Sequence, residues 1–152
     1  MAPLDEDIDD GPGRGDVVVG VDGTEASVGA LRQGAQFARS MHVPLLAMCA
    51  WSPETSSAAA AEAVLGDATR RVFGDGPPAG FRAVASEGAP EVLLRRASEH
   101  ARMLVIGSSE RDPGLRTQDS VSIAIAKGAR CPVVVFHATR RADLQPVGTG
   151  PA

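Results

Sequence analysis

A polar loop after an apolar segment carries the residue types that could hold a phosphate group. The stretch VIGSSERDPGLRTQDSVS, residues 105–122, begins like a buried strand and ends like the start of a helix. Helix N-termini attract anions, and glycines let the backbone approach a phosphate closely. The candidate residues of this loop are Gly107, Ser108, Ser120, Val121 and Ser122. Gly107 can equally serve a tight turn and the two later serines can cap a helix, so a ligand role stays one of two interpretations.

A second candidate group lies in VVVGVDGTEAS, where Gly20, Val21 and Asp22 end an apolar segment. Asp22 can cap the following turn or helix, or it can accept a hydrogen bond from a ligand. The sequence leaves these two roles open.

Motifs for catalysis or metal binding are missing from the sequence. It contains no P-loop, no G-x-G-x-x-G between a strand and a helix, no G-x-S-x-G and no H-E-x-x-H. His42, His100 and His137 are far apart, and Cys49 and Cys131 form no C-x-x-C pair. We therefore expect a binding protein rather than an enzyme, without a metal site and with reduced, buried cysteines.

Composition narrows the class of partner. The net charge is −4, but residues 1–15 hold five acidic residues against Arg14, so the rest balances 14 acidic and 14 basic residues. A neutral folded part argues against nucleic-acid binding, which needs a basic face. No apolar run approaches the ~20 residues of a membrane span, and the acidic start resembles no targeting peptide. We expect a cytoplasmic protein.

The elements that must position the candidate residues alternate along the chain. Short apolar segments predict five strands: Val17–Val21, Pro44–Ala50, Phe81–Ser86, Met103–Ile106 and Val133–Phe136. Helical patterns lie between them, over residues 24–41, 56–73, 90–101 and 120–128. The alternation in FRAVAS, residues 81–86, predicts a strand near a sheet edge. Residues 1–15 and 140–152 are expected to be disordered tails around one domain, residues 16–139.

Strict alternation of strands and helices predicts an α/β fold with a doubly wound parallel sheet and helices on both faces. Ligands of such sheets bind beyond the carboxyl ends of the strands, where the strand order reverses. The predicted site therefore comprises four loops, which are Asp22-Gly23-Thr24, Ala50-Trp51, Ser86-Glu87-Gly88 and the loop from Gly107 onward.

The core resembles the universal stress protein family over about residues 16–137. VVVGVDGTEAS resembles its first strand and loop, MCAWSP the end of its second strand, SEGAPEVLLRRASEHARMLVIGSSE the segment up to its fourth strand, and GARCPVVVF its last strand. The resemblance implies a five-stranded sheet in the order 3-2-1-4-5 and a homodimer through Val133–Phe136. It also implies that an adenine nucleoside would contact Gly20, Val21, Asp22, Ala50 and Gly107.

The ATP-binding signature of that family, G-x2-G-x9-G-[ST], is altered here. Gly107 and Ser120 match its ends, but Glu110 and Asp119 replace two glycines and the spacing between them is one residue short. A carboxylate about 4 Å from a phosphate costs roughly 4 kcal/mol per charge pair at an effective dielectric constant near 20. We therefore expect weak or absent ATP binding and a regulatory role through protein partners. The alternative is a sensor that binds ATP or AMP.

Overall fold

The computed structural model of the chain describes residues 15–109 and 124–138. Its five strands are β1 (Val17–Gly20), β2 (Leu45–Trp51), β3 (Arg82–Glu87), β4 (Met103–Ser109) and β5 (Val133–Ala138). They form one parallel sheet in the order β3-β2-β1-β4-β5. The predicted doubly wound α/β fold and its strand order are confirmed.

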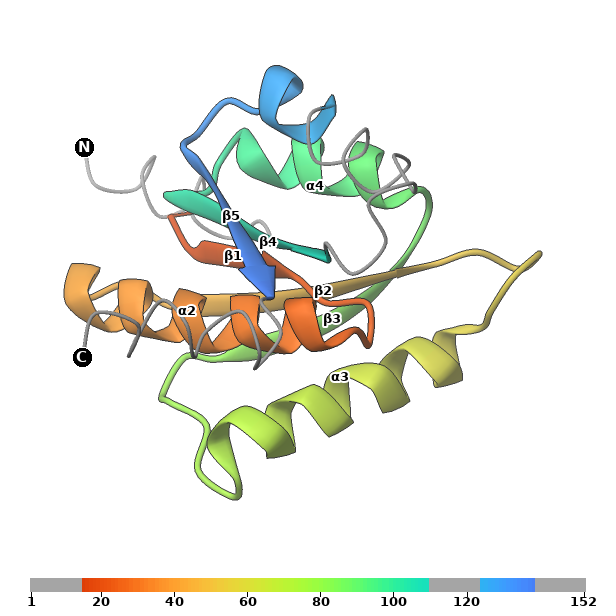
Figure 1. Ribbon diagram of the computed structural model, residues 1–152, viewed down its shortest axis with the longest axis horizontal. Helices are drawn as coiled ribbons and strands as arrows, with labels where there is room; N and C mark the ends of the chain where they lie inside the picture. Colours follow the sequence, from red (N-terminus) through yellow and green to blue (C-terminus); the bar gives the residue numbers. More distant parts are fainter. Residues whose placement is uncertain (1–14, 110–123, 139–152) are drawn as a thin grey trace, which may run out of the picture.

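Helices cover both faces of this sheet. The helices are α2 (Glu25–Met41), α3 (Ala58–Phe73) and α4 (Pro90–Ser98), and residues 124–128 form a further helical segment. Figure 1 shows α2 and α3 on one side of the sheet and α4 with residues 124–128 on the other. Each face has its own apolar cluster: Val17 and Val19 belong to the cluster under α2 and α3, and Val18 to the cluster under α4. The three valines of β1 are fully buried, because β1 is the central strand.

Local sequence signals fix the helix ends. The Thr24 hydroxyl accepts a hydrogen bond from the Ser27 N–H at 3.1 Å, and Ser57 caps α3 in the same way through the Ala60 N–H. Helix α2 stops at His42, which adopts a left-handed conformation with φ of 59°. These boundaries lie within two residues of those predicted.

Two boundaries in the structure differ from the predicted ones, because residues beyond them make backbone hydrogen bonds to the folded part. β4 continues to Ser109, beyond the predicted end at Ile106, because it stays paired with β5 up to Ala138. Gly15, predicted to belong to the N-terminal tail, donates its N–H to the carbonyl oxygen of His100. The rest of both predicted tails, and the predicted start of the last helix, lie outside the described residues. Within the described part of the chain, no helix is long and apolar enough to cross a membrane.

Candidate ligand site

The strand order reverses between β1 and β4, and five of the predicted site residues lie at the carboxyl ends of these two strands. The chain runs outward from β1 through β2 to β3 and then crosses back to β4 on the other side of β1. Gly20 ends β1, and the Val21 N–H continues the pairing with β2 through the Met48 carbonyl oxygen at 2.8 Å. Gly107 and Ser108 are among the last three residues of β4. A crevice at such a reversal is where open α/β sheets bind ligands.

Asp22 has a structural role at the start of α2. Its Oδ1 accepts hydrogen bonds from the Thr24 N–H at 3.0 Å and from the Thr24 hydroxyl at 2.6 Å. The backbone N–H of Asp22 donates to the Ser27 hydroxyl at 3.2 Å. These bonds hold the exposed Asp22 carboxylate in one orientation, with Oδ2 making no further bond among the described residues. Asp22 thus caps the turn before α2, whereas Thr24 caps the helix itself, and a ligand contact through Oδ2 stays a prediction.

Gly107 is required by close packing rather than by a turn. A Cβ atom on this residue would lie 2.5 Å from the carbonyl carbon and oxygen of Ala26, and 2.8 Å from the backbone nitrogen of Ser27. Because these are backbone atoms in the first turn of α2, they cannot move aside as a flexible side chain would. Gly107 therefore brings the end of β4 against the N-terminus of α2, where backbone dipoles favour negative charge.

Ser108 carries a buried hydroxyl without a partner. The residue is 2% exposed, and its Oγ has no hydrogen bond in the part of the chain that the structure describes. A buried hydroxyl that loses its bonds to water destabilises the folded state unless something replaces them. This hydroxyl lies near the carboxyl end of β4, next to the strand reversal.

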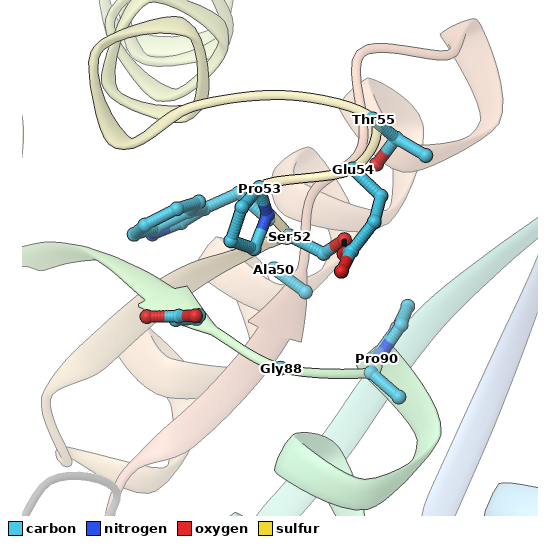
Figure 2. A pocket seen from close by; sticks show the side chains of 10 residues that line it. Ala50, Ser52, Pro53, Glu54, Thr55, Gly88 and Pro90 are labelled. Carbon is cyan, nitrogen blue, oxygen red and sulfur yellow. Dashed lines mark hydrogen bonds between the residues drawn. The ribbon is translucent and has the colours of Figure 1, made fainter.

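A cavity of about 580 Å³ lies one strand further along, at the ends of β2 and β3. Ala50, a predicted site residue, contributes to it. Figure 2 shows the β2–α3 loop on one side of the cavity and the β3–α4 loop on the other. The residues that line it are Ala50, Trp51, Ser52, Pro53, Glu54, Thr55, Glu87, Gly88, Ala89 and Pro90.

Hydrogen bonds fix the two loops around this cavity. The Gly88 N–H donates to the Trp51 carbonyl oxygen at 2.9 Å and ties the β3–α4 loop to β2. Gly88 adopts φ of 142°, a conformation that favours glycine. On the opposite side, the Ser52 hydroxyl donates to Glu54 Oε1 at 2.7 Å. This bond lowers the pKa of the Glu54 carboxyl group below its ordinary value, so the group is ionised at neutral pH.

Cys49 lies just before Ala50 in β2 and is not a reactive thiol. Burial, together with the negative charge of Asp22, raises the pKa of the Cys49 thiol above its ordinary value. A thiol with a raised pKa stays protonated at neutral pH and is a poor nucleophile. Both cysteines are free; Cys49 is buried as predicted, whereas Cys131 is only partly buried. Among the described residues, no three His, Cys, Asp and Glu side chains come together as a metal-binding group.

The sequence identified part of this site. Ser120, Val121 and Ser122, as well as Glu110 and Asp119, lie outside the described residues. The predicted loops included Trp51, Glu87 and Gly88 but missed Ser52, Glu54 and Thr55. The signal that could have identified them is the polar SPETSS segment between a buried strand and the cap of α3.

The sequence of this chain is similar to a family model and to proteins of that family. The model of the universal stress protein family matches residues 13–137. Two universal stress proteins of Mycobacterium tuberculosis, Rv3134c from strain H37Rv and MT3220 from strain CDC 1551, are each 35% identical over 128 residues. The alignment covers 80% of this chain but 48% of each relative, so the chain spans about half of their length.

Solved structures share the fold at lower identity. A universal stress protein in complex with cAMP has a TM-score of 0.66 at 22% identity, covering 84% of this chain and 99% of that one. One from Archaeoglobus fulgidus in complex with dAMP has a TM-score of 0.59 at 21% identity, covering 80% and 96%. One from Arabidopsis thaliana with AMP bound has a TM-score of 0.56 at 19% identity, covering 86% and 95%. The family match covers residues 13–137, which include all five strands except the last residue of β5, and the chain therefore belongs to the universal stress protein family.

Proposed function

We propose that this chain is a regulatory binding domain that takes an adenine nucleotide with a short phosphate chain at the β1–β4 strand reversal. It binds rather than catalyses, and it acts as a homodimer on a protein partner. The observation that carries the ligand proposal is Ser108, a buried hydroxyl without a partner at the reversal. Such a group is stabilised when a ligand supplies the missing hydrogen bond.

The length of the phosphate chain is argued from charge. Glu110 and Asp119 stand at two glycine positions of the family's ATP signature, and each adds a negative charge there. A triphosphate meets more of this repulsion than a monophosphate. The complexes with cAMP, dAMP and AMP support a monophosphate ligand, because each of these ligands carries one phosphate group.

Calorimetric titration of the wild-type protein and Ser108→Ala with AMP and ATP tests this function. We expect AMP to bind the wild-type protein more tightly than ATP does. Removing the hydroxyl should weaken AMP binding about fivefold, as expected for one ordinary hydrogen bond. The same substitution should not destabilise the ligand-free protein, since it removes a buried polar group that has no partner.

The paired measurements separate a ligand role from a structural one. A drop in the thermal midpoint of ligand-free Ser108→Ala would mean that the hydroxyl serves the fold. Wild-type protein that binds neither nucleotide at millimolar concentration would overturn the ligand proposal and leave the regulator without a nucleotide.

A further inference from the structure

The charged residues that line the cavity at the ends of β2 and β3 are both acidic. They are Glu54 and Glu87, and among the described residues that line it none is basic. A phosphate entering this space would meet two like charges, which repel it. The part of a ligand that fits here is neutral or cationic and carries N–H donors, because carboxylate oxygens only accept hydrogen bonds.

The two carboxylates point to different parts of the cavity. Successive residues of a strand point to opposite faces. Trp51 packs against the cluster under α2 and α3, and its register partner Glu87 lies on that same face. Ala50 therefore points to the other face, which α4 covers. Figure 2 shows the Glu54 carboxylate directed from the β2–α3 loop toward the space beside Ala50, with Gly88 and Pro90 across from it.

Glu54 is also held in place for this contact. The Ser52 hydroxyl occupies Oε1 and fixes the direction of the carboxylate. The backbone N–H of Glu54 also donates to this carboxylate, and because two carboxylate oxygens together offer about four acceptor positions, positions remain for a ligand. Its neighbours Ala50, Pro53 and Pro90 offer apolar surfaces that suit a flat ring. The cavity thus combines apolar walls with one oriented acceptor, as small-molecule sites do.

We infer that Glu54 is a specificity-determining residue for the nucleobase: its carboxylate accepts a hydrogen bond from an exocyclic amino group of a base that enters the cavity beside Ala50. This inference rests on the proposed nucleotide function and adds to it the residue that selects the base. Ser52 is a positioning residue, because it acts through Glu54. The ordinary pKa of a carboxyl group is already below neutral, and the Ser52 bond lowers that of Glu54 further, so the acceptor is charged under assay conditions.

The test compares adenosine with purine riboside, which differs from adenosine only by lacking the amino group at position 6. Calorimetric titrations use the full chain. Both ligands are nucleosides, so no phosphate group complicates the comparison. We expect the wild-type protein to bind adenosine about tenfold more tightly than purine riboside, the low end for a hydrogen bond to a charged group. Glu54→Ala should reduce this ratio to about one and leave the affinity for purine riboside unchanged.

Two further variants control this experiment. Glu87→Ala removes the other carboxylate of the cavity and should keep the tenfold ratio, because Glu87 lies on the face of Trp51. Glu54→Gln retains a carbonyl oxygen as acceptor and should give an intermediate ratio. Glu54 and Glu87 are both exposed, so these variants should fold, and circular dichroism checks that they do.

The outcomes distinguish this inference from the proposed function. Equal binding of both nucleosides by the wild-type protein, or a ratio that survives Glu54→Ala, would overturn the role of Glu54 and leave nucleotide binding intact. A ratio lost in Glu87→Ala instead would assign the selection to the other face. Wild-type protein that binds no adenosine would overturn both proposals.

Discussion

Individual ion pairs of this protein differ in environment more than in length. Arg82 Nη2 lies 2.8 Å from Asp16 Oδ2, and the Asp16 side chain is 3% exposed. Arg71 Nη2 lies 2.7 Å from Glu25 Oε2, but both of these side chains are exposed. Water screens the exposed pair, whereas the buried Asp16 carboxylate depends on its partner. The first pair also joins residues on either side of β2, since Asp16 precedes β1 and Arg82 begins β3.

Arg82→Ala should destabilise the protein more than Arg71→Ala, although both remove an arginine from a short ion pair. The first leaves a buried carboxylate without its partner, which costs about 1–3 kcal/mol. The second returns Glu25 to water and should leave the unfolding midpoint nearly unchanged. Urea denaturation of both variants measures the difference. Equal midpoints would mean that water replaces Arg82 at Asp16.

At the scale of elements, the end of β4 depends on how closely α2 approaches it. Gly107 faces the backbone of Ala26 and Ser27, and Gly29 of the same helix faces the ring of Phe136 from β5. Two glycines thus allow α2 to lie against both strands on one side of the reversal. Gly66 in α3 is different, because a Cβ there would meet only the end of the Arg70 side chain, 3.8 Å away.

Gly107→Ala and Gly66→Ala should therefore change stability in opposite directions. A methyl group at position 107 pushes on helix backbone and should cost about 1–3 kcal/mol. The same change in the open helix position of α3 should stabilise by about 0.5–1 kcal/mol through helix propensity. Thermal unfolding of both variants tests this. A stable Gly107→Ala protein would show that α2 can shift without loss.

For the whole molecule, the two edges of the sheet are unlike. β3 forms one edge and contains charged residues at both ends, Arg82 and Glu87. β5 forms the other edge, and its residues Val133–Phe136 are apolar and only half-buried. An apolar edge strand invites pairing with another chain unless it is covered. This difference supports the proposed twofold dimer through β5.

Val134→Lys and Val135→Lys test the dimer from both faces of β5. Val134 packs against the cluster under α2 and α3, and Val135 against the cluster under α4. Each lysine places a charge at the edge, so a sizing column should show monomer or aggregate instead of dimer. Circular dichroism separates loss of pairing from loss of folding. Two folded variants that both remain dimeric would place the interface elsewhere.

The sequence alone predicted the strands and helices and their order along the chain. Thr24 and Ser57 cap helices through bonds to residues three positions on, and buried strands are apolar over a few consecutive residues, so these signals are local. Alternation of strands and helices then limits the topology to parallel, right-handed connections. The alternation within FRAVAS predicted a strand near a sheet edge, and β3 forms an edge of the sheet.

Only the tertiary structure decided which residues meet at the site. The sequence suggested that Gly107 serves a tight turn. The structure shows instead that a side chain at this position would collide with the backbone of Ala26, which is far away in the chain. Asp16 and Arg82 are 66 positions apart, and no local pattern pairs them. In the sequence, Glu54 is one polar residue of a loop. Only the fold brings the β3–α4 loop to the other side of the cavity that Glu54 lines. Such contacts depend on how segments that are far apart in the chain pack against each other, and the spacing of residues along the chain does not specify that packing.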